Sequence, residues 1–196
     1  MIPADFRSLI EGRPRDPGVP GAPDGDTWLA RLPQLIEEYA ERWNLRIEDG
    51  ARYGQNALVL PVRRGAGEKA ALKLTWPHRE AVNEHLALRH WAGRGSVRLL
   101  AAEPADQALL LERLDASRPL TGVSILDACE VIGGLFRTLD RPAPARIMPL
   151  AERVDGSDRT APEVPRRLTE QARSLTGDLL QDVGELRLVH EDLHDG

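Results

Sequence analysis

The sequence contains very little cysteine and very little lysine. Cys129 is the single cysteine in 196 residues, which excludes a disulfide framework and a zinc site built from several thiolates. Lys69 and Lys73 are the only lysines, and every other basic side chain is an arginine. Each of the two lysines can therefore be weighed separately as a functional candidate.

Basic clusters and long apolar runs are missing as well. The formal net charge is −5, and no group of basic residues with interleaved aromatics offsets it, which argues against a nucleic-acid partner. The N-terminus has no basic stretch followed by a long apolar run, and no later segment is long enough to span a bilayer. We therefore expect a cytoplasmic protein that is not embedded in a membrane.

A stretch near the N-terminus, residues 12–26, alternates Pro and Gly so densely that neither helix nor strand can persist there. Asp26 at its end predicts the N-cap of an amphipathic helix. Pro33 would lie in the first turn of this helix or mark a restart. The apolar face of the predicted helix comprises Trp28, Leu32, Leu35, Ile36, Tyr39 and Trp43.

The middle of the chain has short β-like runs separated by turn-forming residues, with one helix inserted. Helical spacing occurs at residues 79–93, where Val82, Leu86 and Trp91 fall close to one stripe and Gly93 can end the helix. The predicted strands are residues 45–49, 57–63, 69–76, 96–103 and 107–114.

After Leu114 the β-like runs end, and the sequence patterns predict mainly helices. Residues 124–140 predict a helix despite Gly133 and Gly134, against which another helix could pack closely. An irregular, Pro-rich stretch then precedes a further helix and a last strand at residues 184–189. The apolar residues of that further helix are Leu168, Ala172, Leu175 and Leu179.

This order of elements predicts an α+β fold. We expect an N-terminal segment over residues 1–26 and, over residues 27–114, an antiparallel five-stranded lobe with a leading helix and one inserted helix. Residues 115–196 would form part of a mainly helical lobe.

The final stretch, "RLVHEDLHDG", admits three readings. His190 to His194 has the spacing HExxH of zinc peptidases, but that motif requires a helix, and Leu186 to Val189 favour a strand. The second reading is an H-x-D-x-H turn of a phosphoryl-transfer enzyme, with Asp192 as the candidate base. The third reading is a polar surface turn without a catalytic role.

Lys73 lies in the middle of a predicted strand, on the face opposite Leu72 and Leu74. Such a lysine is usually a solvated side chain on a strand. Glu84, eleven positions later on the next predicted helix, can form an ion pair with Lys73, and Glu80 is a competing partner one turn earlier. A lysine held by a carboxylate is what phosphoryl transfer from ATP requires at the phosphates.

The last apolar run of the strand region, "LLLERLD", ends where helices begin. At such a boundary a hinge would offer the backbone carbonyl of Glu112 and the backbone amide of Leu114 to an adenine ring. The competing interpretation of this segment is a buried edge strand.

With these elements in this order, the chain resembles the aminoglycoside and hydroxyurea phosphotransferases, especially the streptomycin kinases. The resemblance runs from "WLARLPQLIEEYAERWNL" through "AALKL", "EHLALRHWAGRGSVRLL" and "ALLLERLD" to "LVHEDLH". The last piece is similar to the family's H-G-D-L-H-x-x-N catalytic loop. The resemblance implies a protein-kinase-like bilobal fold and transfer of phosphate from ATP to an alcohol group of a streptomycin-type aminoglycoside, or to hydroxyurea.

The resemblance also implies roles for individual residues. Lys73 would contact the α- and β-phosphates and Glu84 would orient it, while Glu112 and Leu114 would hold adenine. Asp192 would accept the proton of the acceptor hydroxyl. The turn "YGQNA", residues 53–57, stands where the family has its phosphate-covering loop.

The sequence departs from the family pattern in two places. Glu191 replaces the usual glycine and puts a carboxylate beside Asp192. The family's metal-binding asparagine, a second metal-binding aspartate and the sugar-pocket helices would lie beyond Gly196. Mg²⁺ is therefore an implied cofactor whose ligands we expect beyond Gly196, we assign no metal ligand, and we expect these 196 residues alone to be inactive. The alternative function is a nucleotide-binding pseudokinase or an interaction module.

Overall fold

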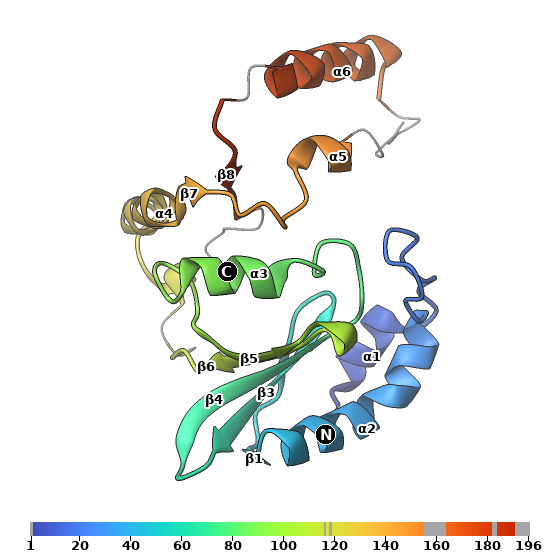
Figure 1. Ribbon diagram of the computed structural model, residues 1–196, viewed down its shortest axis with the longest axis vertical. Coiled ribbons are helices and arrows are strands. Elements are labelled where there is room, and N and C mark those ends of the chain that lie inside the picture. The colour runs from blue at the N-terminus through green and yellow to red at the C-terminus, as the bar shows by residue number, and fades with distance from the viewer. Residues whose placement is uncertain (1, 116, 118, 155–163, 182–183, 191–196) are drawn as a thin grey trace.

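The computed structural model describes residues 2–115, 117, 119–154, 164–181 and 184–190, and it has the predicted α+β composition. Within these residues a six-stranded antiparallel sheet is built from strands between Leu45 and Glu112 (Figure 1). The strand order is β1-β3-β4-β6-β5, and β2 pairs with β3. The bounds are β1 (Leu45–Ile47), β2 (Arg52–Tyr53), β3 (Ala57–Arg64), β4 (Glu68–Thr75), β5 (Leu99–Glu103) and β6 (Ala108–Glu112).

Each predicted strand segment contains a strand, and the sheet has β2 in addition, where the sequence predicted only a turn. Arg52 pairs with Val59 and Tyr53 with Leu58, so β2 continues along β3 beyond the end of β1. Gly50, with φ at +95°, turns the chain between β1 and β2 in a conformation that suits glycine. The composition around Gly50 predicts a turn, and the strand exists because β3 is long enough to pair with both short strands.

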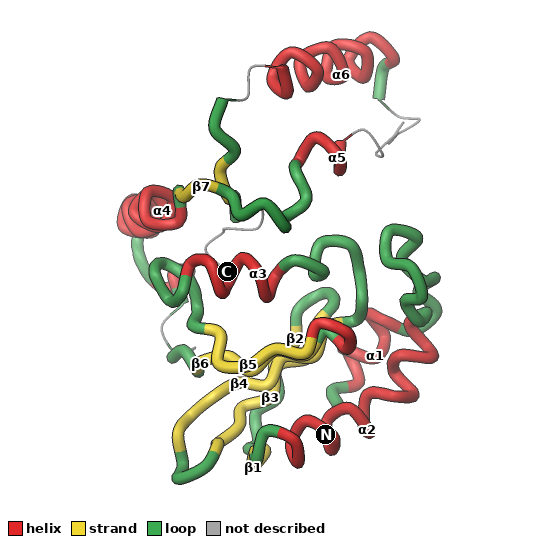
Figure 2. Tube along the Cα trace, viewed as in Figure 1, coloured by secondary structure: helices red, strands yellow, loops and turns green. Residues whose placement is uncertain are grey.

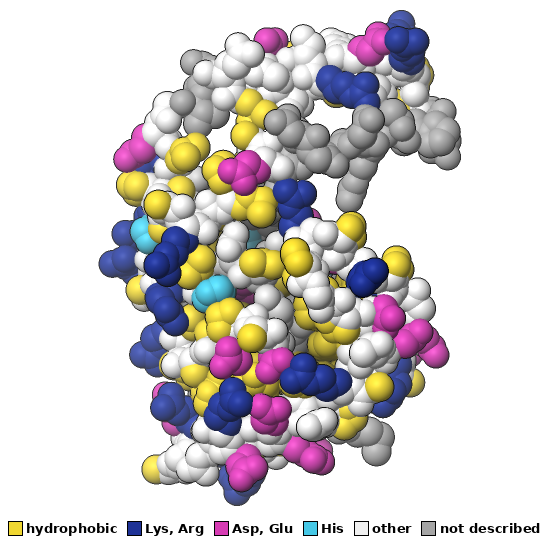
Figure 3. All heavy atoms as spheres, turned by 45° about the vertical axis from the view of Figure 1, so that its right-hand side comes forward, with side chains coloured by type: hydrophobic (Ala, Val, Ile, Leu, Met, Phe, Trp, Pro, Cys, Tyr) yellow, Lys and Arg dark blue, Asp and Glu magenta, His cyan; other side chains and the backbone are white. Residues whose placement is uncertain are grey.

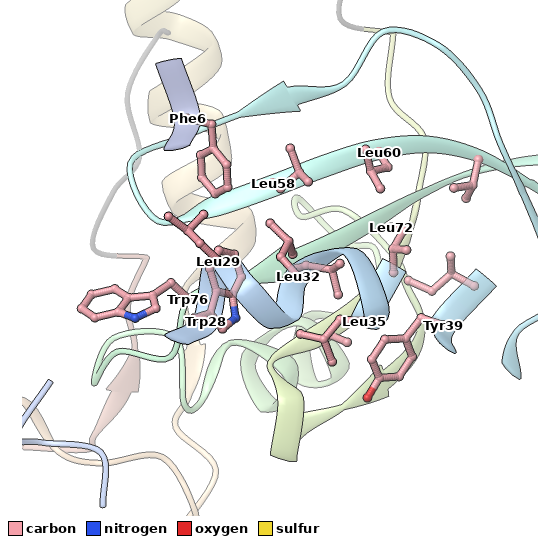
Figure 4. Packing of buried hydrophobic residues seen from close by; sticks show 14 of the residues in the cluster. Phe6, Trp28, Leu29, Leu32, Leu35, Tyr39, Leu58, Leu60, Leu72 and Trp76 are labelled. Atoms are coloured by element: carbon pink, nitrogen blue, oxygen red, sulfur yellow. The ribbon is translucent and has the colours of Figure 1, made fainter. Parts of the chain in front are cut away.

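Two helices, α1 (Ala4–Ile10) and α2 (Gly25–Arg42), cover one face of the sheet (Figures 1 and 2). Their apolar side chains pack against those of β3, β4 and β6 in the main core (Figure 4). Helix α1 was not predicted from the sequence. The fully or almost fully buried members of this core include Phe6, Ile10, Trp28, Leu32, Leu35, Tyr39, Leu58, Leu72, Leu74 and Leu110.

The predicted start of α2 at Asp26 is wrong by two residues. The N-cap is Asp24, whose side chain accepts a hydrogen bond from the backbone N–H of Thr27 at 2.8 Å. Asp26 lies in the first turn and instead accepts from the backbone N–H of Gly12 at 2.9 Å. Pro33 does not restart the helix, because α2 is continuous on both sides of it.

Helix α3 (Glu84–Trp91) covers the opposite face of the sheet (Figure 1). Leu88 packs there against Leu109 and Leu111 of β6. The helix begins five residues later than predicted, since the backbone N–H of Arg79 donates to Asp16 of the N-terminal segment at 3.0 Å, which holds the preceding residues in turns. The helix ends where predicted, at a left-handed Ala92 followed by Gly93.

The part of the chain after the sheet contains helices and a separate two-stranded sheet. These elements are α4 (Ile125–Leu139), α5 (Leu150–Val154), α6 (Arg166–Gln181), β7 (Arg141–Pro142) and β8 (Arg187–Leu188), with β7 antiparallel to β8. The predicted close packing of a helix on Gly133 and Gly134 is wrong for the described residues, because nothing lies within 4 Å of a Cβ built at either glycine. The apolar face of α6 is exposed, with Leu179 at 73%.

The surface carries both signs of charge. The face seen in Figure 3 carries Lys and Arg side chains, several of them along its left edge, and Asp and Glu side chains, most of them in its lower part. Every helix in the described part of the chain is too short or too polar to cross a lipid bilayer.

Candidate functional site

Lys73 and Glu84 meet on the face of the sheet that α3 covers. Lys73 lies at the centre of β4, paired with Val59 of β3 on one side and Leu109 of β6 on the other. Strand alternation places its side chain opposite Leu72 and Leu74, which are buried in the main core. The Lys73 Nζ atom lies 2.6 Å from Glu84 Oε1. The predicted ion pair between the strand and the helix is present.

The ion pair of Lys73 and Glu84 is partly buried and lies at the N-terminus of α3. The side chains of Lys73 and Glu84 are 23% and 28% exposed, so both groups are largely removed from water. Glu84 is the first residue of α3, where the helix dipole stabilises a carboxylate. The contact uses one of the three N–H donors of the ammonium group. An anion can be bound by the other donors without displacing the glutamate.

The predicted hinge lies directly after β6. Glu112 is its last residue, and its backbone N–H donates to the carbonyl of Arg98 at 2.9 Å. The Glu112 carboxylate also accepts from the backbone N–H of Arg98, at 2.7 Å, which ties the end of β6 to the start of β5. Leu114 is 65% exposed. The exposed segment therefore starts from a firmly held strand end.

A triad of charges that the sequence analysis missed fixes this segment. Arg113, between the two predicted hinge residues, donates to Glu48 Oε2 at 2.5 Å, and Arg63 donates to Glu48 Oε1 at 2.6 Å. Hydrogen bonds from Arg113 and then Arg63 lower the pKa of Glu48 from 4.5 to about 2. The triad joins segments 15 and 65 residues apart. No motif marks it, and only the strand register could have predicted it.

The predicted phosphate-covering turn lies at the end of β4, close in the sheet to Lys73. The backbone N–H of Gly54 donates to the carbonyl of Ala57 at 3.0 Å and closes the turn between β2 and β3. The carbonyl of Asn56 accepts from the backbone N–H of Trp76 at 2.8 Å. Because Trp76 is three residues beyond Lys73, the turn and the lysine belong to the same end of the sheet.

The predicted catalytic residue Asp192 and its neighbour Glu191 lie outside the described residues. The structure does place the start of their motif. The strand β8 precedes it as predicted, and the ring of His190 stacks on Trp91 of α3 with centroids 5.8 Å apart. His190 is not in a helix, whereas the HExxH motif of zinc peptidases lies on a helix. Among the described residues there is no group of three or more His, Cys, Asp or Glu that could hold a metal ion.

An open hollow of about 400 Å³ lies elsewhere, beside the turn between β3 and β4. Its lining includes Asn44, Arg46 and Arg63 and none of the predicted site residues. One of the two arginines in this lining, Arg63, is already paired with Glu48.

Comparison with known proteins agrees with the motifs. Residues 42–196 match the model of a family described as aminoglycoside/hydroxyurea antibiotic resistance kinase. The chain is 39% identical over 182 residues to a streptomycin 6-kinase of Streptomyces glaucescens, covering 88% of this chain and 59% of that protein. It is 41% identical over 187 residues to a hydroxyurea phosphotransferase of Kitasatospora aureofaciens, covering 90% and 55%.

A third relative is a streptomycin 6-kinase of Streptomyces griseus, which is 36% identical over 204 aligned positions, covering 99% of this chain and 66% of that protein. The chain therefore spans between 55% and 66% of the length of these three relatives.

Proposed function

Because the chain belongs to the aminoglycoside/hydroxyurea antibiotic resistance kinase family, we propose that it carries the ATP-binding part of a phosphotransferase. The acceptor in this proposal is a hydroxyl group of a small antibiotic, either a streptomycin-type aminoglycoside or hydroxyurea. Both proposed partners, ATP and the antibiotic, are small molecules, and we propose that the protein acts in the cytoplasm, where ATP is available.

The observation that carries this proposal is the 2.6 Å contact between Lys73 Nζ and Glu84 Oε1. A free lysine has a flexible four-carbon stem and pays a large entropy cost to hold one position. Glu84 removes that freedom before the nucleotide binds. The ammonium group is then already positioned to bind the α- and β-phosphates, as phosphoryl transfer by positioning and charge stabilisation requires.

The proposed adenine site is the segment after β6. The Glu112 carbonyl would accept from the adenine amino group, and the Leu114 backbone N–H would donate to a ring nitrogen. The ion triad of Glu48, Arg63 and Arg113 supports this assignment, because it limits the motion of the backbone between these two groups. A rigid hinge loses less entropy when adenine binds.

Asp192 is the proposed base. Its carboxylate would orient the acceptor hydroxyl and accept its proton as the phosphoryl group is transferred. Divalent magnesium would supply charge neutralisation at the β- and γ-phosphates. The described residues include no acidic cluster suited to that ion, so we assign it no ligand here.

The transfer reaction is tested with protein expressed from the complete gene that encodes these residues. It is incubated with ATP and either streptomycin or hydroxyurea, and the acceptor is analysed by mass spectrometry. We expect a phosphorylated form of at least one acceptor, and a rate at least about 10²-fold lower for Asp192→Asn because the base is lost. Phosphorylation of neither acceptor, or an unchanged rate for Asp192→Asn, would contradict the proposal.

A further inference from the structure

A chain of hydrogen bonds joins the N-terminal segment to the turn between β2 and β3. Arg13 Nη1 donates to Asn56 Oδ1 at 2.5 Å, and Asn56 Nδ2 lies 3.3 Å from His78 Nε2. Since an amide nitrogen only donates, His78 Nε2 accepts, and Nδ1 donates to the carbonyl of Trp76 at 2.8 Å. In each of these hydrogen bonds a donor therefore faces an acceptor.

Arg13 projects from a rigid platform. Its backbone N–H donates to the carbonyl of Ile10 at 3.1 Å, and its carbonyl accepts from the backbone N–H of Gly25 at 2.9 Å. Ile10 ends α1 and Gly25 begins α2, and both helices are anchored in the main core. The backbone of Arg13 is therefore held between two helices that both pack on the sheet.

Trp76 connects the same platform to the strand that carries Lys73. The guanidinium of Arg13 lies 5.9 Å from the centroid of the Trp76 ring, a cation–π distance. The indole N–H of Trp76 donates to the carbonyl of Pro23 at 3.2 Å, and the side chain is buried. The turn, the end of β4 and the N-terminal segment thus form one connected unit.

We propose that Arg13 is a positioning residue of the nucleotide site, which fixes the turn at residues 54–56 over the phosphates through its hydrogen bond to Asn56. The inference rests on the proposed function, since it assumes that the phosphates bind at Lys73 beneath this turn. It assigns the N-terminal segment, which lies outside the matched part of the family model, to the ATP site. A turn held in place before binding loses less entropy when the phosphates arrive.

The positioning role has a consequence that a purely structural role does not share. The turn would cover the phosphates and not the adenine ring, so loss of Arg13 should weaken the binding of ATP and leave the binding of adenosine unchanged. General loss of the fold would weaken the binding of both ligands. Asn56 lies outside the left-handed region of φ, so alanine can replace it without backbone strain.

The test measures the affinity for ATP and for adenosine by calorimetry, with protein expressed from the complete gene that encodes these residues. The variants are Arg13→Ala, Arg13→Lys, Asn56→Ala and the double variant Arg13→Ala/Asn56→Ala. Arg15→Ala is the matched control, because it removes the same charge from an exposed position in the same segment. Hydrogen exchange of the turn amides is measured in parallel without nucleotide.

We expect Arg13→Ala to bind ATP about tenfold more weakly, the equivalent of one charge-assisted hydrogen bond, with the adenosine affinity within about twofold of the parent. Arg13→Lys, which keeps a donor, should retain most of the ATP affinity. The double variant should be no weaker than either single variant, because both changes break the same contact. The turn amides should exchange faster in Arg13→Ala and at the parent rate in Arg15→Ala.

Two negative results are distinguishable. If the parent binds ATP but Arg13→Ala binds it equally well and exchanges its turn amides at the parent rate, Arg13 does not position the turn and the inference is wrong. If the parent binds no ATP, the proposed nucleotide site itself is wrong, whatever the exchange rates.

Discussion

Charged side chains join different elements around the sheet. Lys73 pairs with Glu84 across the space between the sheet and α3, and Glu48 is held by Arg63 and Arg113. Both sets surround places where we propose that ATP binds. These ion pairs hold the charged side chains in position in the absence of ligand. A protein with preorganised charges can stabilise a charged ligand at low reorganisation cost.

The Glu48 triad makes stability depend on pH. The pKa of Glu48 is lowered in the folded state from 4.5 to about 2, so the charged carboxylate stabilises the fold above about pH 4.5 and this contribution is lost as the pH falls toward 2. We expect Glu48→Gln to lower the urea midpoint equally at pH 7 and pH 5, and by less at pH 3. The control is Glu41→Gln at an exposed position of α2, which should change little at any pH. A Glu48→Gln effect that is the same at all three pH values would refute the triad's role.

Helices and strands were predictable where a periodic pattern extends over several turns or residues, and their ends were less so. The apolar face of α2 was predicted correctly, but Asp24 and Asp26 both suit an N-cap. The choice between them depends on Gly12, whose N–H is bound by Asp26 and which is 14 residues away. A contact between residues so far apart cannot be predicted from the sequence around Asp24 and Asp26.

The same limit applies to the proposed site. The pairing of Lys73 and Glu84 was predictable, because one lies on a strand and the other begins the next helix. The contacts of Arg13 with Asn56 and of Arg113 with Glu48 bridge 43 and 65 residues and depend on how distant parts of the chain pack together. The short β2 was missed for a similar reason, since its pairing with β3 decides its structure.

Two glycines in helices should respond oppositely to alanine. A Cβ at Gly25 would lie 2.0 Å from the carbonyl oxygen of Ile10, so Gly25→Ala must separate α1 from α2 and should cost about 1–3 kcal/mol of unfolding free energy. Gly133 in α4 has open space around it, so Gly133→Ala should stabilise the chain by about 0.5–1 kcal/mol through helix propensity. Urea unfolding at neutral pH measures both changes. Stabilisation by Gly25→Ala would show that α1 does not pack on α2 as described.

Over the whole molecule, α3 is the element that links the two halves. Its first residue, Glu84, holds Lys73, and its last residue, Trp91, packs on Leu139 and Leu188. The indole N–H of Trp91 donates to the carbonyl of Leu139 at 2.9 Å, and its ring stacks on His190. One helix therefore contacts both the proposed phosphate-binding lysine and the start of the motif that contains Asp192.

Replacement of Trp91 should destabilise the elements that follow the sheet more than the sheet itself. Trp91 is 3% exposed, and we expect Trp91→Ala to cost about 3–5 kcal/mol by leaving a cavity. Trp91→Phe keeps much of the apolar contact and loses the hydrogen bond, so its cost should be nearer 1 kcal/mol, roughly that of one buried hydrogen bond.

Hydrogen exchange locates this effect. The amides of α4 and β8 should exchange faster in Trp91→Ala, while those of β3 and β4 keep the parent rates because their core is separate. Equal acceleration in β3 and β8 would mean that the two halves form one cooperative unit and that Trp91 is not a specific link.

The most direct test of the account is the affinity for ATP measured by calorimetry with protein expressed from the complete gene, in its parent form and as the variants Lys73→Ala and Lys69→Ala. Lys69 is the matched control, because it lies on the same strand and on the same face of the sheet but is exposed at the far end. The account predicts that the parent binds one ATP per chain, that Lys73→Ala binds it at least about tenfold more weakly, and that Lys69→Ala binds it as the parent does. Equal affinity in all three proteins, or a loss in Lys69→Ala as large as in Lys73→Ala, would contradict a nucleotide site built on Lys73 and Glu84.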